Sequence, residues 1–458
     1  MTNIKLVVAG VLLVVAAAGA AAAQQFVARD PGGRGGAAGA GAPLDGLSAS
    51  QQAFFDVGAT EFQDTDGLAE GLGPRFNLDS CAGCHIQPAM GGTSPATNPQ
   101  IAVATAFGAR NTVPSFVTLN GPIREARFKR HADGTPDGGV HALFVISGRV
   151  DDGGDATGCR IPQPNFDRQL AAGNVIFRIP TPVFGAGLIE QIPDATILAN
   201  QNVSASVKAA LGISGRPHRI RVTGEPNNNG NDGTVARFGW KAQNKSLLLF
   251  AGEAYNVEMG ITNELFQTER DETASCQLVA TPNNTTNTDG TIGTDTISAI
   301  EKFAFFMRLL APPQPSMQTP GGAPSIGRGR ATFGAVGCAL CHTPTLQTGA
   351  SSVAALSNKP VNLFSDLLLH NMGPALADEV SQGGATGDEF RTAPLWGLGQ
   401  RIFFLHDGRT SELIAAIRAH KSAGNTQFRA SEANAVVERF NALPESGKQD
   451  LLNFLRSL

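Results

Sequence analysis

Helical spacing of apolar residues is clear in only a few stretches of this chain. The strongest interior helix is predicted over 300–310, and its apolar run ends before Pro312 because proline cannot continue a helix. Near the start, Ser48 and Gln51 have the spacing of a capping box, which predicts a helix that begins there. Ordered structure is therefore expected from about residue 48 onward.

The middle of the chain has a different pattern. Between about 139 and 225, short apolar and β-branched runs are separated by glycine and proline, which predicts strands and loops. These runs are 143–146, 175–178 and 219–222. Two stretches rich in Asn, Thr and Gly, 227–233 and 281–296, lack apolar periodicity and are predicted to be surface loops. We interpret the region at about 139–225 as an insertion of strands and loops.

The N-terminal pattern predicts export. An apolar run from 6 to 23 follows Lys5 and ends in three alanines, as in a cleavable signal peptide over 1–23. An uncleaved membrane anchor is the alternative, because the run approaches spanning length. Residues 24–47 are rich in Gly and Ala, so they are expected to form a flexible linker. The expected location is the periplasm, with no stable membrane span after cleavage.

Composition fits a chain of more than one domain. At 458 residues there is room for two or three domains, and 54 glycines and 27 prolines favour loops and turns. We expect an N-terminal domain over 48–320, which includes the insertion, and a C-terminal domain over 321–458. The formal net charge is −4 and no basic stripe is present, so no nucleic-acid partner is expected.

Four of the six cysteines form two Cys-X-X-Cys-His motifs, at Cys81, Cys84 and His85 and at Cys338, Cys341 and His342. Cysteines in this spacing bind the vinyl groups of a c-type haem through thioether bonds, and the histidine becomes the proximal iron ligand. A zinc site or a redox dithiol is the alternative, but neither motif has a second ligand pair or a βα context. We therefore expect two covalently bound haem c groups.

The remaining cysteines are Cys159 and Cys276. In an oxidising compartment two such residues are expected to form a disulfide. Two buried free thiols are the alternative, because the sequence does not show whether their Cα atoms lie within bridging distance.

Distal ligands decide whether a haem carries electrons or binds substrate, because six-coordinate iron has no open position. Helical spacing makes His420 a candidate metal ligand at the second haem, with Met372 as the competitor. Plain packing is the alternative for both. At the first haem, Tyr255 and Met259 are the candidates, and Tyr255 is otherwise a core residue.

Several phrases of the sequence resemble a known family. They are Gly71-Leu-Gly-Pro-Arg-Phe-Asn-Leu-Asp-Ser-Cys81, Arg237-Phe-Gly-Trp-Lys-Ala-Gln243, Glu258-Met-Gly-Ile-Thr262, Leu367-Leu-Leu-His-Asn-Met-Gly373, Phe390-Arg-Thr-Ala-Pro-Leu-Trp396 and Phe404-Leu-His-Asp-Gly-Arg409. Over 48–458 the chain resembles the bacterial di-haem family named "putative thiol oxidoreductase". More distantly, it resembles the di-haem cytochrome c peroxidases and the di-haem enzyme of methylamine utilisation. We expect a mainly α fold of two cytochrome c-like haem domains, with the strand-and-loop insertion in the first.

The resemblance also implies roles for single residues. In the peroxidases the axial ligand of the electron-transfer haem follows a His-Asp-Gly turn, and the matching position here is His420. The peroxidases carry a tryptophan between the haems, matched by Trp240, and a catalytic glutamate followed by methionine, matched by Glu258. A carboxylate beside open iron can move a proton between the two oxygens of peroxide. A solvated charge or a salt bridge to Arg237 is the alternative for Glu258.

These observations predict a periplasmic di-haem oxidoreductase of the cytochrome c peroxidase type. Electrons from a donor protein, such as a small c-type cytochrome, would enter at the C-terminal haem. They would reach a substrate-facing N-terminal haem that reduces hydrogen peroxide or another small oxidant. The alternatives are a non-catalytic electron carrier, a thiol oxidoreductase and an accessory role in metal uptake. Calcium is a further candidate cofactor, for which no residue pattern gives a site.

Overall fold

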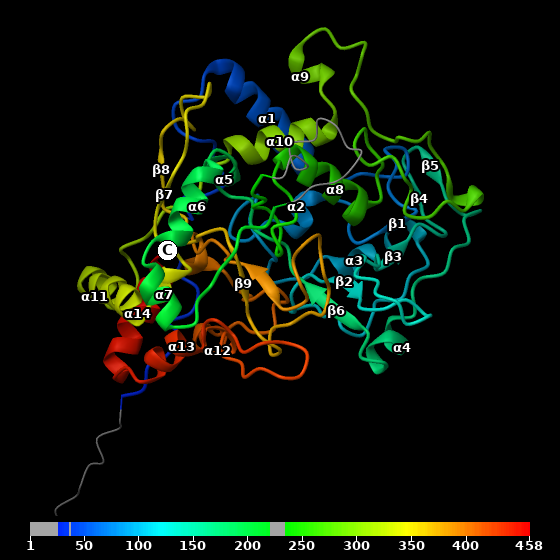
Figure 1. Cartoon of the computed structure of the whole chain (residues 1–458). Helices are drawn as coiled ribbons and strands as arrows, with labels where there is room; N and C mark the ends of the chain where they lie inside the picture. Colours follow the sequence, from blue (N-terminus) through cyan, green and yellow to red (C-terminus); the bar gives the residue numbers. More distant parts are fainter. Residues whose placement is uncertain (1–25, 36–37, 220–233) are drawn as a thin grey trace, which may run out of the picture.

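The computed structural model describes residues 26–35, 38–219 and 234–458 (Figure 1). The predicted signal peptide at 1–23, most of the predicted strand at 219–222 and the predicted loop at 227–233 lie outside the described residues. In the described part of the chain, no helix is both long enough and apolar enough to cross a membrane.

Helices joined by long irregular stretches make up both halves of the molecule. Those of the first half are α1 (Ala49–Gln63), α2 (Cys81–Cys84), α3 (Gln100–Val103), α4 (Phe166–Ala171), α5 (Ala186–Glu190), α6 (Asp194–Asn202), α7 (Ala205–Ala210), α8 (Leu247–Met259), α9 (Gly293–Thr296) and α10 (Ala299–Leu309). Those of the second half are α11 (Gly322–Val336), α12 (Leu413–Ala419), α13 (Asn434–Asn441) and α14 (Glu445–Ser457). Single 3₁₀ turns are η1 (Ala106–Gly108), η2 (Ala274–Cys276), η3 (Cys338–Leu340) and η4 (Leu398–Gln400).

Strands in the described residues form two-stranded antiparallel sheets only. The pairs are β1 (Arg75–Phe76) with β3 (Phe144–Val145), β2 (Glu125–Phe128) with β6 (Val175–Arg178), β4 (Val150–Asp151) with β5 (Gly154–Asp155), β7 (Leu346–Gln347) with β8 (Pro360–Val361), and β9 (Leu369–Asn371) with β10 (Glu389–Arg391). The predicted strands at 143–146 and 175–178 are therefore confirmed as β3 and β6. The rest of 139–225 differs from the predicted insertion of strands and loops, because it also contains the short helices α4, α5, α6 and α7. The predicted loop at 281–296 ends in the single-turn helix α9, which the sequence did not indicate.

Helices α1, α8 and α10 pack together beside the first cysteine motif (Figure 1). Helix α1 begins with the predicted capping box of Ser48 and Gln51, and α10 ends at Leu309, as the prolines that follow require. The helices approach closely at Gly58, where an added Cβ atom would lie 2.3 Å from the carbonyl oxygen of Lys302. This packing supplies the apolar wall of the first candidate site.

In the second half, α11 packs along α14. Their contact is close at Gly329, where an added Cβ atom would lie 2.0 Å from the carbonyl oxygen of Asp450. The Phe333 and Phe454 rings meet across it at 5.5 Å. This pair of helices covers the second cysteine motif.

The Gly- and Ala-rich segment differs from the predicted flexible linker. Asp30 lies buried against α14, where Arg456 donates two hydrogen bonds of 2.8 Å to its carboxylate. The amide of Arg34 donates to the carbonyl oxygen of Gly399 at 2.7 Å, and the amide of Leu44 donates to α10. The described residues of 24–47 are thus held to the second half and to α10. A few hydrogen bonds suffice to anchor a segment whose other residues are mostly Gly and Ala.

Cys159 and Cys276 form a disulfide, with their Cα atoms 4.6 Å apart. The expected pairing is confirmed. It links the insertion to the loop that follows α8, and both residues are buried. The fold combines helices and short strands with long irregular stretches. A mainly α class and a division into two cytochrome c-like domains stay predictions.

Candidate haem-binding sites

The first motif lies at the centre of the first half. Cys81 and Cys84 form α2, and His85 follows directly. The His85 ring is held by a 3.0 Å hydrogen bond from Nδ1 to the carbonyl oxygen of Gly92, and its centroid lies 6.0 Å from that of Phe62. Burial lowers the pKa of His85, which favours the neutral ring that binds a metal. A ring held through Nδ1 has Nε2 for an iron ligand bond.

These residues line a cavity of about 1230 Å³, including its open side. One part of its wall is apolar and comes from Phe62, Phe303 and Met307 on α1 and α10. Another part is strongly polar and contains side chains of the β2–β6 ladder and α8. The polar lining residues are Asn77, Gln100, Arg124, Glu125, Arg127, Arg178, Gln243, Glu253 and Glu258.

Glu258 lies on α8 in this polar wall. Asn77 donates from Nδ2 to Glu258 Oε2 at 2.7 Å, and Glu258 is hydrogen-bonded to Glu125. Burial, and then the charge of Glu125, raises the pKa of Glu258 well above its usual range. Burial acts in the same direction on Glu125, but the adjacent Arg127 outweighs it and holds the pKa of Glu125 below its usual value. Glu258 therefore holds a proton that it shares with an ionised Glu125. Arg237, which the sequence offered as a salt-bridge partner for Glu258, forms an ion pair with Asp194 instead.

Tyr255 and Met259 line the same cavity from α8. The Tyr255 hydroxyl donates to Asp66 Oδ2 at 3.1 Å, and burial, as the largest cause, raises the pKa of Asp66 to about 7. The Met259 sulfur lies 3.9 Å from the Cys81 sulfur. Both side chains therefore lie at the wall of the first cavity, and their role as iron ligands stays a prediction.

The second motif forms η3 and lines a cavity of about 1450 Å³, including its open side. His342 donates from Nδ1 to the carbonyl oxygen of Phe364 at 3.1 Å. The wall is mostly apolar and includes Phe333, Phe440 and Leu451 of α11, α13 and α14.

His420 lies at the C-terminal end of α12 and lines this second cavity together with His342. Its Nδ1 donates to the carbonyl oxygen of Ala416 at 2.7 Å, which again favours Nε2 as the free ligand atom. Burial, and then the nearness of His420, lowers the pKa of His342 to about 4. Met372 lines the same cavity, in a cluster with Trp240 and Phe390. The structure therefore brings both candidate ligands to one cavity.

Trp240 lines both large cavities and the smaller one between them. Its indole Nε1 donates to the carbonyl oxygen of Ile179 at 2.9 Å. The indole lies edge-on to His406 with the centroids 6.3 Å apart, and His406 stacks on Phe390 at 4.3 Å. Trp240 thus borders both candidate haem cavities, and its role between two haems stays a prediction.

The linings of both cavities match the chemistry of a haem. Each has two cysteine sulfurs and one histidine nitrogen on its wall, in the order that covalent attachment requires, and a large apolar surface for a flat macrocycle. All four motif cysteines are free thiols, so none is committed to a disulfide. The residues present fit haem in both cavities.

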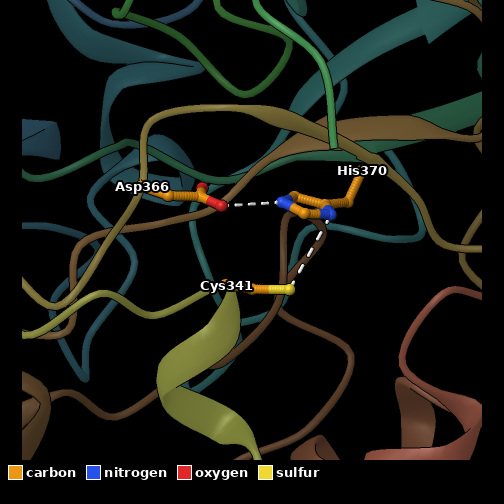
Figure 2. A group of neighbouring side chains, drawn as sticks. All are labelled: Cys341, Asp366 and His370. Atoms are coloured by element: carbon orange, nitrogen blue, oxygen red, sulfur yellow. Dashed lines mark hydrogen bonds and ion pairs between the residues drawn. The ribbon is translucent and has the colours of Figure 1, made fainter. Parts of the chain in front are cut away.

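A buried network beside the second motif was missed in the sequence. His370 lies between two carboxylates: Asp366 is 2.9 Å from Nε2 and Glu432 is 2.8 Å from Nδ1. Figure 2 shows Asp366 beside one ring nitrogen of His370 and Cys341 beside the other, and the Cys341 sulfur lies 3.7 Å from Nδ1. Burial alone would lower the pKa of His370, but Cys341 and Asp366 outweigh it and raise the pKa well above its usual value. Because both ring nitrogens already face carboxylates, these groups form a network of ion pairs rather than a metal site.

The family profile described as "Di-haem oxidoreductase, putative peroxidase" matches residues 128–458. The chain belongs to this di-haem oxidoreductase family. Haem is therefore its cofactor, and the family assignment makes it an oxidoreductase. The matched residues contain the second motif and begin after the first, so the first site rests on its own motif and cavity.

Two solved structures have weak similarity to this family member. Hydrazine synthase of Kuenenia stuttgartiensis, in a xenon-pressurised crystal, is 15% identical with a TM-score of 0.28, over 62% of this chain and 72% of that chain. A MauG-like protein associated with microbial copper homeostasis is 20% identical with a TM-score of 0.23, over 35% of this chain and 52% of that chain. At these TM-scores neither structure supports an inference here. No curated protein matches the chain.

Proposed function

We propose that this di-haem oxidoreductase is a periplasmic peroxidase. Electrons from a small c-type cytochrome enter at a haem c attached to the second motif. They pass by way of Trp240 to a haem c attached to the first motif, where hydrogen peroxide is reduced. The observation that carries the proposal is the unequal lining of the two cavities: Trp240 borders both, whereas the proton-holding Glu258 borders only the first.

His85 and His342 are the proposed proximal iron ligands, and His420 is the proposed distal ligand of the second haem. When bound, haem supplies a redox-active iron, which carries electrons where both axial positions are filled and accepts an oxidant where one is open. The second cavity has His420 facing the same space as His342, which suits electron transfer. The first cavity instead has its carboxyl groups on the wall, which suits proton transfer.

Reduction of one peroxide takes two electrons and two protons and gives two water molecules. Glu258 is placed to supply a proton to the oxygen that leaves and to recover one from the oxygen that stays. Asn77 fixes the carboxyl group through Oε2. Glu125, which is ionised beside Arg127, is the second proton acceptor in the same wall.

Turnover with a defined donor tests this function. The purified holoprotein is mixed with a reduced small c-type cytochrome and hydrogen peroxide, and oxidation of the donor is followed. We expect two donor molecules to be oxidised for each peroxide consumed. A rate equal to that of a Cys81→Ala, Cys84→Ala variant would contradict a peroxidase and favour a non-catalytic electron carrier.

A thiol oxidoreductase has less support. The structure leaves four cysteines on the walls of the two haem cavities and buries the other two in the disulfide of Cys159 and Cys276. No exposed dithiol remains for such chemistry, since all six cysteines lie in the described residues.

A further inference from the structure

Two arginines line the wall where the haem cavities approach each other. Arg391 ends β10, and Arg401 follows η4. Both line the second cavity and also the smaller cavity of about 540 Å³, which shares Trp240 with both large ones. Each arginine is only 8% exposed, so both guanidinium groups lie inside the protein.

Neither arginine has a carboxylate partner within the described part of the chain. Arg391 donates from Nε to the carbonyl oxygen of Gly239 at 3.0 Å, and from Nη1 to the carbonyl oxygen of the adjacent Thr392 at 3.4 Å. The side chain of Arg401 makes no hydrogen bond or ion pair with the described residues. The buried Arg456 shows the usual arrangement, because it forms a two-pronged ion pair with Asp30 at 2.8 Å.

Such a pair of buried cations is costly to leave uncompensated. Burial lowers the pKa of Arg401 to about 10. Burial, and then the charge of Arg401, lowers the pKa of Arg391 to about 10 as well. The two groups therefore repel each other inside a cavity wall whose nearest neighbours are mostly apolar. This arrangement indicates an anion that occupies the space beside them.

We propose that Arg391 and Arg401 bind the propionate carboxylates of the haem attached at Cys338 and Cys341. Haem carries two such carboxylates, on the edge of the macrocycle away from its vinyl groups. The planar guanidinium group matches a carboxylate with two parallel hydrogen bonds, and a buried pair of this kind is stronger than an exposed one. This inference rests on the proposed haem in the second cavity, and it assigns these arginines as positioning residues that also raise its reduction potential.

The test compares Arg401→Gln with Arg401→Lys, and Arg391→Gln with Arg391→Lys. The control is Arg328→Gln, which removes an exposed arginine of the same half that pairs with Asp450. Haem content is measured first, by the pyridine haemochrome method. The reduction potential of each haem is then titrated by visible and EPR spectroscopy, and the propionate bending modes are recorded by resonance Raman spectroscopy.

We expect each glutamine variant to shift the potential of the second haem to more negative values and to move its propionate modes. The lysine variants, which keep the charge, should show a smaller shift, and the control should show none. Unchanged potentials and modes in proteins that hold both haems would overturn the inference. A shift confined to the first haem would also overturn it, by assigning the arginines to the other haem's propionates. If the glutamine variants do not fold, the propionate Raman modes of the lysine variants test the inference instead: shifted modes support it and unchanged modes overturn it. A wild-type protein without haem at the second motif would instead refute the proposed function.

Discussion

The two haem cavities both border Trp240, yet the polar groups of their walls are arranged differently. The first cavity has Glu125, Glu253 and Glu258 in its wall together with three arginines. The second has Glu432 together with Arg391 and Arg401, which have no carboxylate partner in the described residues. The attachment motifs are nearly identical, so the motif alone does not distinguish the two sites. The surrounding walls do, because only the first contains Glu258, whose pKa is raised, and only the second contains two buried arginines without a carboxylate partner in the described residues. Function in this chain is therefore assigned from what surrounds each motif.

The largest effect on peroxide turnover is expected from replacement of Glu258. Glu258→Gln keeps the size of the side chain and removes the proton that the mechanism needs, so peroxide turnover should fall by about 10²–10⁴-fold. The measurement is steady-state donor oxidation at saturating peroxide. Glu253→Gln is the matched control, because Glu253 is a half-buried glutamate of α8 in the same cavity. Equal losses in the two variants would argue against a specific role for Glu258.

Replacement of His420 tests the electron-transfer assignment of the second cavity. His420→Gly should convert the second haem from low-spin to high-spin, because the iron loses its sixth ligand, and leave the first haem unchanged. EPR and visible spectra of the oxidised protein measure this. Met372→Ala is the control, since Met372 lines the same cavity. A high-spin haem in the Met372→Ala variant alone would reverse the ligand assignment.

The disulfide gives the first half a constraint that the second half does not have. Replacing Cys159 and Cys276 by serine should lower the free energy of unfolding by about 2–5 kcal/mol, as expected for a native disulfide. The loss should fall on the insertion that the disulfide links to the loop after α8. Hydrogen exchange resolved along the chain measures where protection is lost. Loss spread evenly over α11–α14 would contradict this placement.

A smaller effect is expected when acid breaks the ion pair of His370 and Glu432 and so lowers the stability of the fold. Burial raises the pKa of Glu432, but the hydrogen bond and charge of His370 outweigh it and lower that pKa to about 2. A depressed pKa adds stability that is present above the unfolded value near 4.5 and is lost as pH falls from there toward 2. The melting temperature of the wild type should thus fall more steeply over this range than that of Glu432→Gln. Glu438→Gln, at an exposed pair with Lys421, should keep the wild-type slope.

Local sequence signals predicted a useful part of the structure. The capping box at Ser48 and the end of α10 depend on neighbours within a few residues, and the structure has both. The strands at 143–146 and 175–178 were visible as short apolar runs bounded by glycine and proline, although their pairing partners β1 and β2 were not. The cysteine count correctly left Cys159 and Cys276 as a pair.

Long-range contacts set the limit of prediction. His370 stands in a phrase that the sequence analysis quoted, yet its partner Glu432 comes 62 residues later and no periodicity joins them. The packing of the Gly- and Ala-rich segment depends on Asp30 meeting Arg456, 426 residues away. Arg391 and Arg401 are similar, because only the fold shows that they are buried without a carboxylate partner in the described residues. Burial and charge balance are properties of the assembled chain.

The central claim is that the two haems differ in function, and the half-reduced protein tests it most directly. One electron equivalent is added per molecule, and EPR and visible spectra are recorded before and after cyanide or peroxide. The account predicts that the haem of the second motif is low-spin and unchanged by either addition, while the haem of the first motif binds cyanide and reacts with peroxide. Two low-spin haems that neither addition alters, in every redox state, would contradict the account.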